Sequence, residues 1–286
     1  MGAGLTMVSS GPGLLIICFN RPDLLEQVLD RIPADFRGPV FISRDGPREG
    51  RPADAPLVEE VEKLIIQRAS RLGNLSTAIH SENLGCRVHV QTAIDWFFNN
   101  VSEGIILEDD CLPNVEFFDF CVAMLEKWRD IPKIMHVSGD NSLQIPAPAD
   151  CSYGFTTRPL VWGWATWRRA WVQCDKELFS WQHIRGSAFE AGLWPSRREG
   201  KKRRILLDSI FENGKPDTWD AQWLYSIRLM GGLAIMPGRN LVTNIGFRDD
   251  ATHTRKPNHP RANFPTGSIF PLRHPKTILP TMKAFV

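Results

Sequence analysis

The feature that most constrains the fold is a repeated alternation of short, mostly apolar runs with helical patterns. Each run has the length of a strand and is followed by a polar turn and then by apolar residues at helical spacing. The runs and the helical segments after them are Leu14–Phe19 before 24–32, Val40–Ser43 before 57–65, Leu75–His80 before 90–97, and Gly104–Leu107 before Val115–Trp128. Short unalternating strands separated by helices predict an α/β fold, with a mainly parallel sheet covered on both faces.

Length and composition fit an ordinary globular chain. The 286 residues allow one large domain or two small ones, and 34 basic against 32 acidic side chains leave a net charge of +2, so nothing demands nucleic acid. No apolar run reaches the roughly 18 residues needed to cross a bilayer, and the N-terminus lacks a secretory pattern. The six cysteines show no C-x-x-C pair and no zinc-like spacing. We expect a soluble, cytoplasmic protein with reduced thiols.

The fourth run ends in three consecutive carboxylates, Glu108, Asp109 and Asp110. In open sheets of this kind, ligands lie in the crevice beyond the carboxyl ends of the strands, which is where the triplet should emerge. Clustered carboxylates repel one another unless a cation or donor groups compensate them, and hard cations choose oxygen ligands. The triplet therefore indicates a divalent-cation site, although a solvated acidic turn would give the same residues.

Beyond residue 140 the pattern changes, and eight of the ten tryptophans lie between Trp162 and Trp223. In the stretch WGWATWRRAW, Trp164, Trp167 and Trp171 recur at i, i+3 and i+7, which is typical of the buried stripe of a helix. Aromatic faces also stack on sugar rings, so Trp162 or Trp164 could instead line an acceptor cleft.

The basic run RREGKKRR precedes an apolar ILL and fits a solvated helix face or a surface for anionic lipid headgroups. In the second case the protein would touch the inner face of a membrane peripherally. The contact would use six basic residues, Arg197, Arg198, Lys201, Lys202, Arg203 and Arg204.

Taken together, the motifs IICFNRP, FISRDGP, ILEDDCLP, WGWATW and TWDAQW resemble those of nucleotide-sugar glycosyltransferases with the GT-A fold. The layout is most similar to bacterial enzymes related to eukaryotic N-acetylglucosaminyltransferase I, and the likeness runs from Leu14 to about His274. It implies an inverting, metal-dependent enzyme that moves a hexosyl or N-acetylhexosaminyl group from a nucleotide diphosphate, with UDP preferred, to a hydroxyl. The acceptor would be a glycan or lipid-linked sugar in cell-surface polysaccharide synthesis.

The resemblance also divides the chain. Residues 1–13 would be a flexible tail, residues 14–140 the α/β half that binds the nucleotide sugar, and residues 141–286 the half that binds the acceptor and carries the catalytic residue. The last two parts would form one continuous GT-A domain.

Carried over motif by motif, the resemblance assigns residues to the donor and to a metal. The donor pocket would be formed by Arg21, Asp45, His89, Glu108 and Asp109. The resemblance also implies a Mn²⁺ or Mg²⁺ ion that bridges the donor diphosphate. Asp110 would be the sole carboxylate ligand of this ion, since EDD replaces the spaced D-x-D pattern of many relatives. Metal affinity would then depend heavily on the phosphates of the donor.

Asp220 in TWDAQW aligns with the catalytic base of the family's inverting members, which takes the proton of the acceptor hydroxyl. The alternative for Asp220, and for Asp217 before it, is a capping role at the start of the helix that carries Trp223. If Asp220 is the base, we expect Trp219 and Trp223 to shield its carboxylate partly from water.

A polar segment near the C-terminus, Gly246 to Lys256, corresponds to a part of the relatives that folds over the bound donor. Its His253 could then reach the diphosphate or the metal.

Two rival functions share parts of this pattern. A sugar-phosphate nucleotidyltransferase would bind a nucleotide on a similar sheet, but it needs a glycine-rich loop directly after the first strand, where this chain has NRPD. A non-catalytic carbohydrate-binding protein would explain the tryptophans but leaves the acidic triplet and Asp220 without a role.

Overall fold

The computed structural model describes residues 11–248 and 258–282. The strands of the central sheet are, in chain order, β1 Gly13–Cys18, β2 Val40–Arg44, β3 Leu75–Ile79, β4 Glu103–Glu108, β6 Ile134–Ser138, β7 Tyr153–Thr156, β8 Trp164–Trp167 and β9 Leu233–Pro237. Two further strands, β5 Cys111–Pro113 and β10 Val242–Asn244, form a separate antiparallel pair. The helices are α1 Pro22–Asp30, α2 Asp54–Leu72, α3 Cys86–Asn100, α4 Glu116–Trp128, α5 Arg168–Trp171, α6 Trp181–Ile184, α7 Ala188–Gly192, α8 Arg197–Asn213 and α9 Asp220–Leu229.

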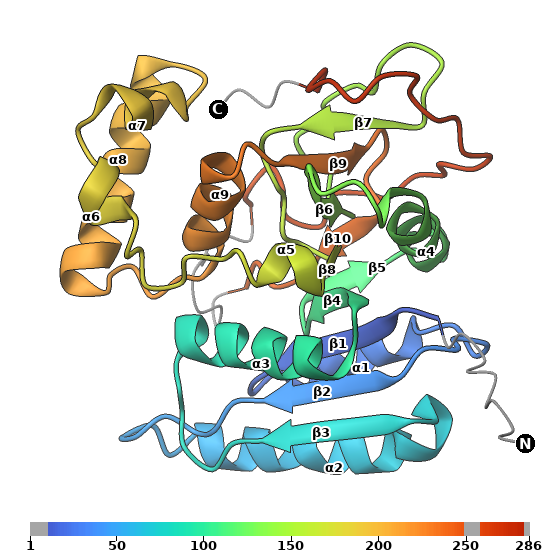
Figure 1. Ribbon diagram of the computed structural model, residues 1–286. Helices are drawn as coiled ribbons and strands as arrows, with labels where there is room; N and C mark the ends of the chain where they lie inside the picture. The colour runs from blue at the N-terminus through green and yellow to red at the C-terminus, as the bar shows by residue number, and fades with distance from the viewer. Residues whose placement is uncertain (1–10, 249–257, 283–286) are drawn as a thin grey trace, which may run out of the picture.

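The central sheet has the order β3-β2-β1-β4-β8-β6-β9-β7, with helices on both of its faces (Figure 1). Among these eight described strands six point the same way, and β8 and β7 run opposite to their neighbours. The α/β class and the mainly parallel sheet predicted from the sequence are confirmed.

Two apolar cores cover the two faces of the sheet. On β1, Leu14 and Ile16 point into a core with α1, α2 and α4, whereas Leu15 and Ile17 point into a second core with α3, α5 and α9. Because successive strand residues face opposite sides, a strand that is covered on both faces must be apolar throughout. This requirement explains the unalternating run on which the sequence analysis rests.

A third apolar cluster packs the helices α6 and α8 against the outer side of α9. Its members include Leu207 on α8 and Leu224 on α9. Figure 1 shows α6, α7 and α8 standing beside α9, away from the sheet. Helix α9 is therefore held between the second core of the sheet and this helical cluster.

The tryptophan-rich stretch is a strand followed by one helical turn, so the helix predicted from its i, i+3, i+7 spacing is wrong. Trp164 and Trp167 lie on β8 and enter opposite cores, and Trp171 on α5 returns to the core of Trp164. The predicted burial is right, with exposed fractions of only 1–2%. The segment is a strand because β4 and β6 pair with it on both sides, which a three-residue spacing does not reveal.

The basic run begins α8, and only part of it faces solvent. The Ser196 hydroxyl caps the helix by accepting from the N–H of Glu199. Arg203 pairs with Glu199 at 2.8 Å and Arg204 pairs with the buried Glu190, so these two arginines are engaged within the protein. The exposed basic residues are Arg197, Arg198, Lys201 and Lys202. A membrane contact through these four stays a prediction; in the described chain no helix has the length and apolar character to span a bilayer.

His136 on β6 joins three elements inside the second core. Its Nε2 lies 3.0 Å from the carbonyl oxygen of Leu160, and the indole N–H of Trp223 donates to its Nδ1 at 3.1 Å. Its ring also stacks on Trp164. Burial lowers the pKa of His136 to about 3, so the imidazole is neutral in the folded chain.

We expect His136 to make stability depend on pH. Between its ordinary pKa of 6.5 and about 3, His136 takes up a proton only in the unfolded chain, so the free energy of unfolding should fall as the pH drops through that window. Urea denaturation from pH 7 to pH 4 should show a shallower fall in a His136→Gln variant. His183→Gln, at an exposed position of α6, is the control and should keep the original slope. Equal slopes in the unaltered protein and in both variants would contradict a contribution of His136 to the pH dependence of stability.

Candidate active site

The carboxyl ends of β2, β1 and β4 bring the predicted polar turns together. The N–H of Asp45 donates to the carbonyl of Cys18, and the N–H of Asp109 donates to the carbonyl of Ile17, both at 3.0 Å. Each acidic turn thus begins by continuing the pairing of its strand with β1. The triplet lies at the edge where the sequence placed it.

A cavity of about 430 Å³ opens over this edge, and residues from the second half of the chain form its other wall. Of the residues singled out in the sequence, the lining contains Arg21, Asp45, His89, Glu108, Asp109, Asp110, Trp162, Asp217, Trp219 and Asp220. Trp164 does not line it, and His253 lies outside the described residues, as do residues 249–256 of the expected lid.

Arg21 binds the acidic triplet. Its guanidinium pairs with Asp109, and Nη1 donates to Oδ2 of Asp110 at 2.9 Å. Asp109 is 2% exposed and also accepts from the N–H of Phe19 at 3.3 Å. A buried carboxylate requires such compensation, so this pair joins the turn after β1 to the turn after β4. A nucleoside contact by Arg21 or Asp109 would compete with this pairing.

Asp45 organises the loop in front of α3. Its Oδ1 accepts from the N–H groups of Gly46 and Leu84 at 2.9 and 2.8 Å, and its Oδ2 accepts from Asn83 Nδ2 and the N–H of Gly85 at 3.0 and 3.2 Å. A carboxylate offers about four lone-pair sites, so the protein itself occupies them all. Asp45 is therefore a loop anchor in this state, and it could accept from a base or ribose only by giving up one of these bonds.

His89 lies in the first turn of α3, whereas the sequence placed it just before the helix. It is 4% exposed, and its Nε2 lies 2.9 Å from the hydroxyl oxygen of Ser43 on β2. Burial lowers the pKa of His89 to about 3, and the charges of His80 and Arg44 act in the same direction. The side chain is neutral and forms part of the cavity wall, so it offers no charge to a diphosphate.

Glu108 is the carboxylate of the triplet that the chain leaves without compensation. Among the described residues its side chain has no hydrogen bond or ion pair, although it borders the cavity. Burial raises the pKa of Glu108 to about 8, and the charges of Asp110 and Asp109 add to the rise. The raised pKa favours the protonated form, which can donate a hydrogen bond into the cavity.

The residues around Asp110 do not make a metal site by themselves. One oxygen is bound by Arg21, and the other lies 3.4 Å from Nδ2 of Asn244. The backbone at Gly246 passes so close to Asp110 that a Cβ at position 246 would fall 2.1 Å from Oδ2 of Asp110. In the described parts of the chain, no group of three His, Cys, Asp or Glu side chains could hold a metal ion. A cation at Asp110 would have to arrive with further ligands of its own.

The two aspartates before α9 have different roles. Asp217 accepts from the N–H groups of Cys86 and Arg87 at 2.9 and 3.2 Å, and so caps α3, a helix 130 residues earlier in the chain. The residue before that helix, Gly85, has φ +80°, and a Cβ there would lie 2.9 Å from the Asp217 carboxylate. The capping alternative is thus correct for Asp217, but on a helix that the sequence did not suggest.

Asp220 is the first residue of α9 and is exposed. Within the described residues its carboxylate accepts from the hydroxyl of Thr218 and has no other hydrogen bond. The expected shielding by Trp219 and Trp223 is wrong, because both indoles are buried in the second core and leave the carboxylate in the cavity wall. The free N–H groups at the start of a helix favour a negative charge there.

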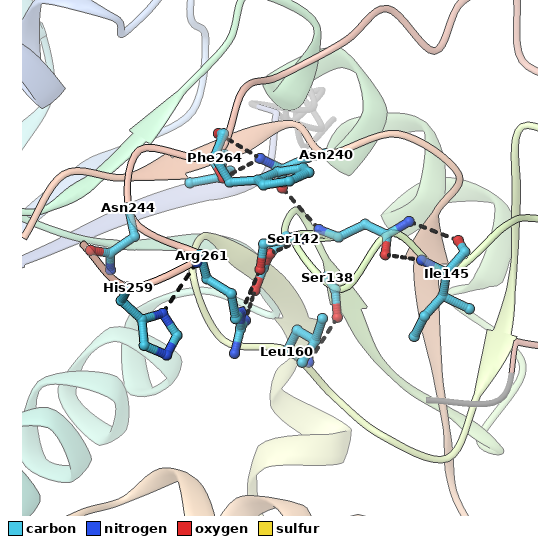
Figure 2. A network of polar contacts seen from close by, with 12 residues as sticks. Ser138, Ser142, Ile145, Leu160, Asn240, Asn244, His259, Arg261 and Phe264 are labelled. Carbon is cyan, nitrogen blue, oxygen red and sulfur yellow. Dashed lines mark hydrogen bonds and ion pairs between the residues drawn. The ribbon is translucent and has the colours of Figure 1, made fainter. Parts of the chain in front are cut away.

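Trp162 and Trp164 lie in different environments. Trp162 lines the cavity, and the guanidinium of Arg261 lies 4.0 Å from the centre of its ring. Figure 2 shows Arg261 beside Ser142, to which its Nε donates at 2.7 Å. Trp164 is 1% exposed and stacks on Trp219, so the prediction that it lines an acceptor cleft is wrong.

Sequence reasoning missed Arg48 and the amide of Asn83. Arg48 borders the cavity, pairs with Asp54 at 2.6 Å and lies over the ring of Phe19. The turn RDGPR and the segment NLG mark both places as loops, but nothing in them indicates which side chains meet.

No protein-family model matches the chain, and no curated protein matches it in sequence. Among solved structures, the chain is similar to a cytidylyltransferase from Leptospira borgpetersenii serovar Hardjo-bovis, at 10% identity over 72% of each chain with a TM-score of 0.38. It is also similar to a protein from Desulfovibrio desulfuricans G20 named as a nucleotide-diphospho-sugar transferase, at 9% identity over 77% of this chain and 98% of that one, with a TM-score of 0.31. Because both TM-scores lie below 0.5, the interpretation of the site rests on its own geometry. The likeness to N-acetylglucosaminyltransferase I stays a prediction.

We expect the two aspartates to differ in their effect on stability. Asp217→Ala removes the cap of α3 and should lower the free energy of unfolding by about 1 kcal/mol. Asp220→Ala is the matched control three residues away, and its exposed carboxylate should leave stability nearly unchanged. Urea denaturation of the two variants measures the difference. A larger loss in Asp220→Ala would contradict the assignment of the cap.

Proposed function

We propose that this protein is an inverting glycosyltransferase that moves a sugar from a nucleotide diphosphate, with UDP preferred, to a hydroxyl acceptor. The observation that carries the proposal is the exposed carboxylate of Asp220 in the same cavity as the polar ends of β1, β2 and β4. A donor on the strand ends would place its sugar between them and Asp220. Trp162 borders the same space and offers an aromatic face to an acceptor.

In this reaction Asp220 acts as the general base. Its carboxylate removes the proton from the acceptor hydroxyl while that oxygen attacks the anomeric carbon from the side opposite the diphosphate. The bond between the anomeric carbon and the phosphate oxygen breaks, and the nucleoside diphosphate leaves with the electron pair. One displacement inverts the anomeric centre, so no second nucleophile is needed. Asp217 is unsuited to the role because its carboxylate caps α3.

The charge of the cavity favours a donor that arrives with a cation. Within its described lining, six carboxyl groups face two guanidinium groups, those of Arg21 and Arg48, and both of these are ion-paired. A diphosphate entering this wall is repelled unless some carboxyl groups are protonated, as the raised pKa of Glu108 favours, or the ligand brings a cation. We therefore propose that Mn²⁺ or Mg²⁺ binds together with the nucleotide, near Asp110.

The rival functions account for less of the site. A nucleotidyltransferase would need a glycine-rich loop after β1 whose backbone N–H groups bind phosphate. In this chain that position holds Arg21, whose guanidinium is paired with Asp109 and Asp110. A carbohydrate-binding protein would use exposed tryptophans, whereas most of those in the second half are buried. The glycan or lipid-linked acceptor, its part in polysaccharide synthesis and the division into donor and acceptor halves remain proposals.

Turnover by Asp220→Asn tests the proposed base. The amide keeps the shape and removes the basicity, so turnover should fall by about 10² to 10⁴ while UDP affinity stays nearly the same. Donor consumption gives the rate, and NMR of the product gives its anomeric configuration. Near-normal turnover, or a product that keeps the configuration of the donor, would exclude this mechanism.

Calorimetry tests the expected order of metal binding. Because the described residues lack a complete metal site, Mn²⁺ alone should bind weakly, whereas UDP should bind at least about tenfold more tightly with Mn²⁺ than with a chelator. Asp110→Asn should reduce that gain without changing the affinity in chelator. The same UDP affinity under both conditions would show that no bridging cation is used.

A further inference from the structure

Helix α8 has one buried face and one face that meets solvent. On the buried face, Leu207 and Ile210 join the third apolar cluster, and a Cβ at Gly200 would lie 3.1 Å from Cδ1 of Trp194. Figure 1 shows α8 at the outer edge of the molecule, away from the sheet. The face of the helix opposite these contacts is therefore open to a partner.

This outer face carries a basic stripe of side chains at the spacing i, i+3, i+4 and i+7. Its members are Arg198, Lys201, Lys202 and Ile205. Residues at this spacing share one side of a helix, and all four side chains are exposed. None of the four lines the cavity that holds Asp220, so the proposed reaction gives the basic stripe no role.

The positive charges of the basic stripe are not compensated within the described chain. Arg203 and Arg204 of the same sequence run pair with carboxylates. The three basic side chains of the stripe form no hydrogen bond or ion pair with any described residue. Arg198 also lies in the first turn of α8, where the partial positive charge of the helix end opposes a cation. These cations would therefore gain from an anionic surface outside the protein.

The apolar member of the stripe indicates the kind of surface. Ile205 is 62% exposed, and Phe189 on α7 is 56% exposed. The ion pair between Arg204 and Glu190 fixes α7 against α8. Basic side chains together with exposed apolar ones are typical of helices that lie on anionic bilayers, where the cations meet lipid headgroups and the apolar groups enter the layer below. A nucleic acid would use the cations alone, and a net charge of only +2 offers it no broad positive surface.

We propose that the outer face of α8 binds peripherally to a bilayer that contains anionic lipids. Arg198, Lys201 and Lys202 contact the lipid phosphate groups, and Ile205 enters the interfacial layer. Long basic side chains suit this arrangement, because their methylene stems lie along apolar surface while the charged ends stay in water. The docking surface lies outside the cavity, so this inference does not depend on the proposed reaction.

Sedimentation with lipid vesicles tests the surface on the full chain. The protein should bind vesicles of equal parts phosphatidylglycerol and phosphatidylcholine at least about tenfold more tightly than vesicles of phosphatidylcholine alone. About 1 M NaCl should remove this difference, because it shortens the screening length to about 3 Å. Lys201→Gln and Lys202→Gln should each weaken binding to the anionic vesicles about fivefold. Lys63→Gln, at an exposed position of α2, is the matched control and should change nothing.

The apolar residue distinguishes a bilayer from other polyanions. Ile205→Ser should weaken binding to the anionic vesicles by at least about threefold and leave any binding of duplex DNA unchanged. Equal binding to the two kinds of vesicle, or undiminished binding by both lysine variants, would overturn the proposal. Tighter binding to duplex DNA than to the anionic vesicles, lost in the same lysine variants, would overturn it as well. UDP affinity depends on the cavity and should be the same in every variant, so a failure of the proposed function appears in a different measurement.

Discussion

The ion pair between Arg21 and the acidic triplet is the interaction on which the candidate site depends. Three carboxyl groups at the end of β4 would repel one another and push the turns apart if Arg21 did not lie between Asp109 and Asp110. Breaking a buried pair of this kind typically costs about 3–5 kcal/mol, because one charge is left without compensation. The pair thereby fixes the positions of the turns after β1 and β4. It leaves Glu108 at the cavity wall without an ion pair among the described residues, and burial raises the pKa of that carboxyl group.

The carboxylates of the cavity divide into those that build it and those that remain available. Asp45 anchors the loop before α3, Asp109 holds Arg21, and Asp217 caps α3 from the far side. Their oxygen atoms are committed to backbone or guanidinium donors, so they set the shape of the cavity. Glu108 and Asp220 are the two whose oxygen atoms are largely free for a ligand. A chemical role is therefore best sought in those two residues.

The wall that faces the strand ends is held in place by aromatic packing. Trp164, Trp171, Trp219 and Trp223 pack on one another in the second core, and Trp164 and Trp223 also contact the neutral His136. This packing sets the position of the first turn of α9, and with it the Asp220 carboxylate. The aromatic residues thus act on the site by positioning α9, while Trp162 alone of the WGWATW motif borders the cavity.

The sequence by itself determined the α/β class, the first four strand and helix pairs, and the meeting of Arg21, Asp45 and the triplet at one edge of the sheet. It could do so because buried parallel strands must be apolar throughout and their carboxyl ends share one edge. Only the tertiary structure decided that WATW is a strand, that Asp217 caps a helix 130 residues away, and that Asp220 is exposed. These features depend on contacts between segments far apart in the chain, for which local spacing and residue type carry no information.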